Sequence, residues 1–153
     1  MRKKVLIAGV GNLLLKDEGL GIHVVRELNK MELPEDVEVR DCGTMGLELL
    51  NLFSEYDKVI VIDAIRGGGE PGEVYKFSLD EVKLKKGRRL LSMHHLDLNT
   101  LLELGREIGV LPSEVVIIGA EPGEIELEIG LSKEVREKLP LILKLVMEEL
   151  SKV

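Results

Sequence analysis

Short apolar runs alternate with amphipathic segments along the whole chain, and this pattern predicts alternating strands and helices. The predicted strands cover residues 4–8, 37–40, 58–62, 74–77 and 115–119. The predicted helices cover residues 20–30, 45–53, 97–108 and 133–150. Strands that alternate with helices in this way predict an α/β fold with a doubly wound, mostly parallel, twisted sheet and helices on both of its faces.

Three local features refine this prediction. The run at residues 58–62 is almost wholly apolar, which places that strand at the centre of the sheet. Residues 74–77 alternate as a half-exposed strand does, so we expect them to join a sheet edge in the antiparallel sense. Pro140 lies inside the last predicted helix, where it is expected to kink the helix or leave one backbone hydrogen bond unmade.

The length and the composition predict one compact domain over residues 1–153. Of the 153 residues, 44% are hydrophobic, enough to bury a core, and 32% are charged. The formal net charge of −7 argues against nucleic acid or an anionic membrane as a partner. The apolar stretch after Lys4 is interrupted by Gly9 and Gly11, so it is too short for a secretion signal or a membrane span. The sequence therefore predicts a cytoplasmic protein.

The loop after the first strand begins as a nucleotide-binding loop does, with glycines at positions 9 and 11. The third glycine of the dinucleotide fingerprint is replaced by Leu14. Asp17 and Glu18 stand just before the first helix, whose N-terminus would otherwise receive a phosphate. Two carboxylates at this point repel a pyrophosphate and attract a cation.

Three residues of metal-ligand type follow strands or lie in connections of the predicted sheet: Glu18, Asp63 and His94. In open α/β sheets, such loops converge beyond the carboxyl ends of the strands. Two carboxylates and one imidazole suit a divalent ion such as nickel, zinc or cobalt and leave positions open for water or substrate. Their spacing is not diagnostic, and Asp17 and Glu18 fit equally well as a helix cap and a partner of the helix dipole.

Other reactive side chains have simpler interpretations. Asp63 closes an apolar strand, where an unpaired carboxylate would be costly. His94 and His95 are adjacent, so only one of them can face a cleft. His23 is interpreted as a helix-boundary residue. The single Cys42 cannot form an internal disulfide and is expected to be buried rather than nucleophilic.

The motifs resemble those of the hydrogenase maturation proteases, which trim the C-terminal extension from the large-subunit precursor of nickel-iron hydrogenases. The opening Gly-Val-Gly-Asn at residues 9–12, with Leu14, Asp-Glu-Gly at residues 17–19 and Gly21, is similar to the family's first motif. Weaker similarities follow in order along the chain. They are Asp-Cys-Gly-Thr at residues 41–44, Ile-Asp-Ala at 62–64, Ser-Met-His at 92–94 and Gly-Ala-Glu-Pro at 119–122.

The resemblance implies an endopeptidase whose Glu18, Asp63 and His94 contact a metal. The metal implied is the nickel already inserted into the precursor, sensed before cleavage, and zinc or cadmium is expected to substitute in vitro. Asp17 and Asp41 are the candidates for activating the water that attacks the peptide bond. The implied partner is the hydrogenase large-subunit precursor.

Two other functions remain open on the sequence. One is a non-enzymatic metal-loading or scaffold protein that binds the same precursor. The other is a nucleotide-binding oxidoreductase, which the glycine turn and Asp41 at the end of the second strand favour and which Leu14 and the acid pair oppose.

Overall fold

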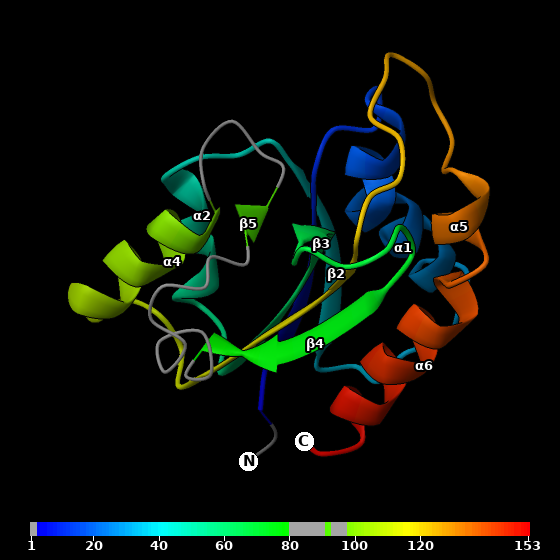
Figure 1. The fold of residues 1–153 in the computed structure, drawn as a ribbon. Helices are drawn as coiled ribbons and strands as arrows, with labels where there is room; N and C mark the ends of the chain where they lie inside the picture. The colour runs from blue at the N-terminus through cyan, green and yellow to red at the C-terminus, as the bar shows by residue number, and fades with distance from the viewer. Residues whose placement is uncertain (1–2, 80–90, 93–97) are drawn as a thin grey trace.

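The computed structural model describes residues 3–79, 91–92 and 98–153, and it contains a twisted sheet with helices on both sides (Figure 1). The strands are β1 Val5–Val10, β2 Val37–Gly43, β3 Lys58–Arg66, β4 Val74–Ser78, β5 Leu91–Ser92 and β6 Glu114–Ala120. The helices are the short 3-10 helix η1 Lys16–Gly19 and α1 Leu20–Leu28, α2 Glu48–Phe53, α4 Leu98–Glu107, α5 Lys133–Arg136 and α6 Leu139–Leu150.

The main strands lie in the order β2-β1-β3-β6-β4. β1 pairs in parallel with β2 and β3, and β3 pairs in parallel with β6. β4 is antiparallel to β6 at the sheet edge, and the two-residue β5 pairs antiparallel with the end of β3. The predicted fold is confirmed, with the apolar third strand at the centre and the half-exposed fourth strand at an edge.

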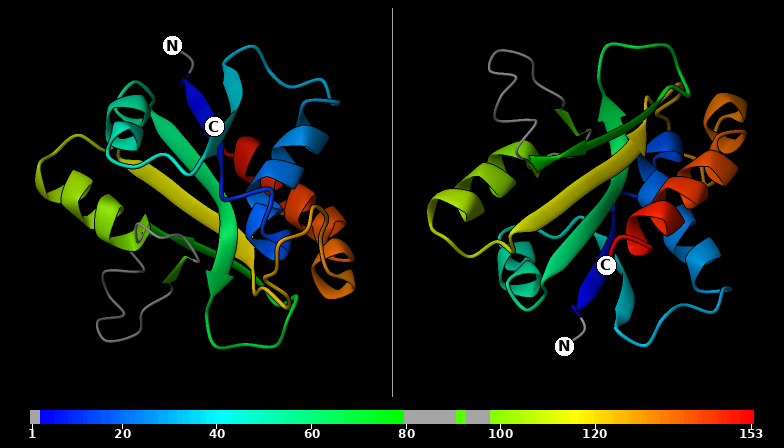
Figure 2. Two further views of the ribbon diagram at one scale, coloured as in Figure 1. Left: turned by 90° about the horizontal axis from the view of Figure 1, so that it is seen from above. Right: turned by 90° about the horizontal axis from the view of Figure 1, so that it is seen from below.

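Two hydrophobic layers cover the sheet. α1, α5 and α6 pack on one face and α2 and α4 on the other, as the two views in Figure 2 show. Successive residues of β3 point to opposite faces, so Ile60 contributes to the layer under α1 while Val59 and Val61 contribute to the layer under α2. A strand covered on both faces must be apolar at every position, which explains its unbroken hydrophobic run.

The structure corrects two predicted boundaries. β3 continues to Arg66, so Asp63 lies within the strand, opposite Gly119 of β6, rather than at its end. The strand continues because β6 offers a parallel partner for each residue as far as Ala64. The last predicted helix is two helices, and Pro140 lies in the first turn of α6, where its missing N–H breaks no helical hydrogen bond.

In the described part of the chain, no helix has the length and apolar character needed to cross a membrane. The cytoplasmic location and the single-domain organisation stay predictions.

Two glycines let the start of α1 lie directly on the strands. A Cβ on Gly9 would come within 2.3 Å of the carbonyl oxygen of Gly21, and a Cβ on Gly21 within 2.4 Å of the carbonyl oxygen of Ile62. Only glycine permits such close backbone approach at both positions. The contact fixes Asp17 and Glu18, just before the helix, at the carboxyl end of β1 and β3.

At the opposite end of the sheet, charged side chains form a buried network. Lys58, which is 1% exposed, donates from Nζ to Oε1 of Glu149 at 2.8 Å. Nζ of Lys76 lies 2.6 Å from Oε2 of the same glutamate. Burial alone would raise the pKa of Glu149, but the hydrogen bonds from Lys58 and Lys76 outweigh it and lower the pKa to about 2. Glu149 is therefore charged over the whole physiological range.

The low pKa of Glu149 predicts a loss of stability in acid. A carboxyl group whose pKa is lower in the folded state stabilises the protein above its unfolded value of 4.5, and this stabilisation disappears as the pH falls toward 2. We expect the difference in unfolding free energy between the wild type and Glu149→Gln to shrink by roughly 2–3 kcal/mol between pH 6 and pH 2.5. Urea unfolding at the two pH values measures it, and a constant difference would contradict the assignment.

Candidate active site

The candidate site lies where the strand order of the sheet reverses. β2 and β3 flank β1 on opposite sides, so the connections that leave β1 and β3 diverge at their carboxyl ends. Crevices at such reversal points are the usual ligand sites of open α/β sheets. Within the described residues, buried carboxylates gather at this end of the sheet from four positions: Asp17, Glu18, Asp63 and Glu121.

Glu18 and Asp63 come from neighbouring segments of this edge. η1, which carries Glu18, packs against β3, which carries Asp63. The Asp63 side chain is fully buried, and its Oδ1 accepts a hydrogen bond from the backbone N–H of Ala64 at 2.8 Å. Glu18 is also buried, and its backbone N–H donates to the carbonyl of Leu15 at 3.0 Å. The turn and the strand thus hold two carboxylates at the edge without exposing them.

The third predicted ligand, His94, lies outside the described residues, as does His95. Among the residues that are described, no three histidine, cysteine, aspartate or glutamate side chains form a metal-binding group. The carboxylates of Glu18 and Asp63 offer hard oxygen donors, and a metal ion bound to them would need further ligands to complete its coordination sphere. The predicted metal set therefore stays a prediction, with two of its members at the same edge of the sheet.

Asp17 holds the loop that follows β6. Its Oδ2 accepts hydrogen bonds from the backbone N–H groups of Gly123 and Glu124, both at 2.8 Å, and from the hydroxyl of Ser132 at 2.7 Å. Its Oδ1 accepts the backbone N–H of Ser132 at 2.7 Å. The side chain does not cap α1. Because its oxygens already accept four hydrogen bonds, Asp17 is suited to positioning this loop.

Replacing Asp17 with asparagine tests this positioning role. The amide NH₂ cannot accept the hydrogen bonds that one carboxylate oxygen accepts, so at least one buried donor at Gly123, Glu124 or Ser132 loses its partner. We expect a loss of roughly 2–4 kcal/mol in unfolding free energy, measured by urea denaturation. Asp41→Asn, on an exposed side chain, is the matched control and is expected to change stability by less than about 0.5 kcal/mol. Equal stabilities for the two variants would contradict the role.

Asp41 and Cys42 lie side by side near the end of β2. Asp41 is exposed, and its Oδ1 accepts the backbone N–H of Gly43 at 2.9 Å. Cys42 is buried, as predicted from the sequence. Burial, together with the nearby charge of Asp41, raises the pKa of the Cys42 thiol to about 11. A thiol held in its neutral form is a poor nucleophile, which agrees with the structural interpretation of this cysteine.

His23 is partly buried on α1, in agreement with its interpretation as a boundary residue. Burial lowers the pKa of its imidazole, and the charge of Arg26 lowers it further. Its surroundings therefore favour the neutral form of the imidazole.

Glu121 organises the glycine-rich loop between β3 and β4, a role that the sequence did not reveal. Its Oε1 accepts hydrogen bonds from the backbone N–H groups of Gly67 and Gly69 at 2.9 and 3.0 Å and from the hydroxyl of Tyr75 at 2.7 Å. The available signal was an acid two residues after the apolar run at residues 115–119. Asp17 and Glu121 thus fix two loops that border Glu18 and Asp63.

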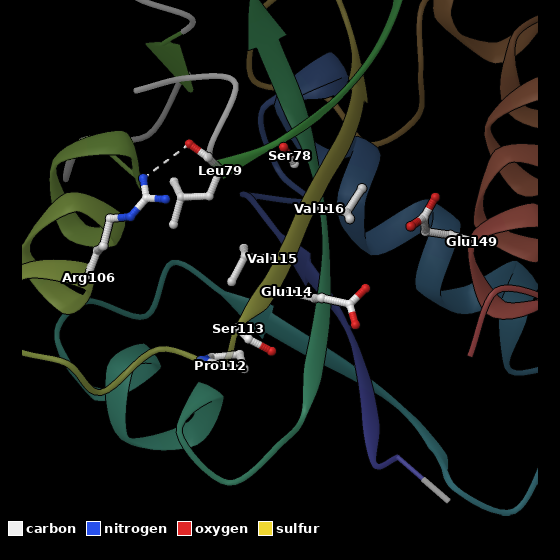
Figure 3. Close-up of a pocket in the computed structure, with 9 residues that line it drawn as sticks. All are labelled: Ser78, Leu79, Arg106, Pro112, Ser113, Glu114, Val115, Val116 and Glu149. Atoms are coloured by element: carbon white, nitrogen blue, oxygen red, sulfur yellow. Dashed lines mark hydrogen bonds between the residues drawn. The ribbon is translucent and has the colours of Figure 1, made fainter. Parts of the chain in front are cut away.

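A separate depression of about 350 Å³ lies at the other end of the sheet, between the end of β4 and the start of β6 (Figure 3). Arg106 reaches across it to the carbonyl of Leu79 at 3.4 Å. Its acidic lining residues, Glu114 and Glu149, are already paired with lysines. None of its described lining residues belongs to the candidate site.

Comparison with known proteins gives consistent matches over most of the chain. A family model described as hydrogenase maturation protease matches residues 22–149. A putative hydrogenase maturation protease of Methanocaldococcus jannaschii is 36% identical over 156 residues, covering 99% of both chains. The solved structure of the hydrogenase maturating endopeptidase HybD from Escherichia coli superimposes with a TM-score of 0.85 at 34% identity, covering 99% of this chain and 93% of that one.

Some relatives are longer than this chain. The hydrogenase expression/formation protein HupD of Bradyrhizobium diazoefficiens is 36% identical over 124 residues, which cover 80% of this chain and 65% of the relative. The HupD protein of Rhizobium leguminosarum bv. viciae is matched over 61% of its length. The match therefore spans slightly less than two thirds of these relatives.

Proposed function

The chain belongs to the hydrogenase maturation protease family, and we propose that it is an endopeptidase that removes the C-terminal extension of a nickel-iron hydrogenase large-subunit precursor. The observation that carries this proposal is the pair of buried carboxylates, Glu18 and Asp63, at the strand-order reversal. Two buried carboxylates at one edge of a sheet favour a positively charged ligand beside them.

We propose that the cation is the nickel ion of the precursor, contacted by Glu18, Asp63 and His94. Two carboxylates and one imidazole do not fill the coordination sphere of a divalent ion, so they bind free metal weakly. An ion that the precursor already holds brings its own ligands, and the protease then completes the sphere. The affinity of the protease for the precursor then depends on whether the precursor holds nickel, so cleavage acts as a checkpoint on nickel insertion.

The two acids that are candidates for activating water in the cleavage step, Asp17 and Asp41, differ in their surroundings. Asp17 is fully buried and its oxygens accept four hydrogen bonds from the loop after β6, which suits a positioning role. Asp41 is exposed and uses Oδ1 for the N–H of Gly43, so it remains accessible to water. We therefore favour Asp41 as the group that accepts a proton from the attacking water, while the metal polarises the scissile carbonyl.

The direct test is to incubate the purified protein with nickel-loaded and nickel-free precursor from the same organism. Intact mass spectrometry follows loss of the C-terminal peptide. Cleavage of the loaded form alone is the expected result and supports both the protease and the checkpoint. Cleavage of both forms overturns nickel sensing. Stable binding without cleavage of either form overturns the protease and favours the scaffold function.

A further inference from the structure

Lys16 has a backbone conformation that lysine rarely adopts. Its φ is +46°, and among the described residues it is the one residue other than glycine with a positive φ. In this left-handed region the Cβ of an L residue comes too close to a backbone carbonyl oxygen, so the conformation is strained. Such strain persists only where the surrounding structure imposes it, and it gathers at functional sites. Lys16 is the first residue of η1 and lies two positions before Glu18.

The side chain of Lys16 binds the loop that follows β6. Its Nζ lies 3.0, 3.3 and 2.6 Å from carboxylate oxygens of Glu124, Glu126 and Glu128. The side chain is 15% exposed, which is low for a lysine. One ammonium group thus gathers three carboxylates that repel one another. In Figure 1 this loop runs beside the segment that precedes α1.

Backbone hydrogen bonds continue this connection to Glu18. Leu15 and Glu128 form a β-bridge, in which the N–H of Lys16 donates to the carbonyl of Glu128 at 2.9 Å. The carbonyl of Leu15 accepts the N–H of Glu18 at 3.0 Å. The loop after β6 is therefore bonded to the Glu18 turn (residues 12–19), and a displacement of the loop shifts the backbone that carries Glu18.

We propose that Lys16 is a positioning residue for Glu18, because it draws the loop after β6 against the Glu18 turn and so holds the Glu18 carboxylate where it contacts the metal of the precursor. The proposal rests on the proposed function, since it takes Glu18 as a contact to that metal. Isolated ion pairs at a surface contribute little, but here one cation serves three carboxylates. Without the lysine, three negative charges lie together beside an acidic turn, and their repulsion moves the loop away. The preference for the nickel-loaded precursor therefore depends on Lys16.

The first test measures this preference, defined as the Kd for the nickel-free precursor divided by the Kd for the nickel-loaded one. Isothermal titration calorimetry gives both constants. Lys16→Met is expected to reduce the preference at least tenfold and to change the Kd for the nickel-free form less than twofold, because only the loaded form uses Glu18. Lys16→Arg keeps the charge and is expected to restore most of the preference. Partial unfolding would weaken the binding of both forms equally, so it does not reproduce this pattern.

Lys30→Met is the matched control for the first test. Lys30 is exposed and pairs with Glu27 at 2.9 Å, and its substitution is expected to leave the preference within twofold. An unchanged preference in Lys16→Met overturns the positioning role. A wild type that binds both forms of the precursor equally overturns nickel sensing, and the second test then decides the positioning role.

The second test measures hydrogen exchange of the protein alone, without precursor. The amide of Glu18 donates to the carbonyl of Leu15, and the amide of Glu128 donates to the carbonyl of Leu14 at 2.9 Å. In Lys16→Met, these two amides are expected to exchange at least tenfold faster than in the wild type, while the amides of β1 and β3 keep their rates. Equal exchange rates in the two proteins overturn the positioning role, whether or not the precursor is cleaved.

Discussion

Replacing Asp63 with asparagine is expected to reduce cleavage of the nickel-loaded precursor by at least about 10³-fold, with the precursor still bound. The substitution keeps the shape of a fully buried side chain and removes the negative charge that is proposed to face the cation of the precursor. Electrostatic stabilisation in a water-excluded site carries a large share of catalysis, so loss of one charge there has a large effect. The measurement is single-turnover cleavage followed by intact mass, with binding measured separately.

Asp57→Asn is the matched control for this prediction. Asp57 precedes the same strand at its opposite end, is exposed, and accepts the backbone N–H of Lys4 at 2.8 Å. Its substitution is expected to leave cleavage within twofold. Full activity in each of the variants Glu18→Gln, Asp63→Asn and His94→Ala would rule out the proposed metal contact. Melting temperatures must accompany these assays because Asp63 is part of the packed sheet.

The largest expected effect on stability comes from Glu149→Gln. Among the described residues, Glu149 provides the one carboxylate within hydrogen-bond distance of the buried Lys58, and the next acidic neighbour, Glu114, lies 3.6 Å away. Leaving a charge buried without its partner typically costs roughly 3–5 kcal/mol. We expect a loss of that order in unfolding free energy at pH 7, measured by urea denaturation.

Two further variants make the stability prediction specific. Glu148→Gln changes the exposed neighbour in the same helix and is expected to cost less than about 0.5 kcal/mol. The double variant Lys58→Met with Glu149→Leu removes both charges and is expected to recover most of the stability, because apolar pairs often replace buried ion pairs without loss. A double variant no more stable than Glu149→Gln would show that the cost arises from packing and not from the unpaired lysine.

The sequence predicted the sheet well because the relevant signals are local. A strand that is packed by helices on both faces of the sheet needs apolar side chains on both faces. The apolar run within residues 58–62 shows this need without any knowledge of which helices pack there. The same run did not reveal that β3 continues to Arg66, since pairing with β6 and not hydrophobicity extends it. The position of Pro140 was also ambiguous, because a proline inside a periodic pattern fits both a kink and a helix start.

The candidate site was only partly predictable for a related reason. Glu18 and Asp63 were found because acids near strand ends in an α/β fold converge at one edge. The anchoring roles of Asp17 and Glu121 depend on partners far away in the sequence, so nothing in the neighbouring residues indicates them. The buried pairing of Lys58 with Glu149 was missed for the same reason, since the two are 91 residues apart.

The contact between Asp17 and Ser132 spans 115 residues of a 153-residue chain, and this separation affects when the site can form. The ribosome makes Asp17 early, yet the serine that it binds emerges only after the last described strand, β6, has been made. Closing so long a loop is entropically costly, and contacts of this kind form slowly. The turn that carries Glu18 therefore acquires its final anchor late in biogenesis, and a nascent chain that stops before Ser132 lacks two of the four hydrogen bonds that Asp17 accepts.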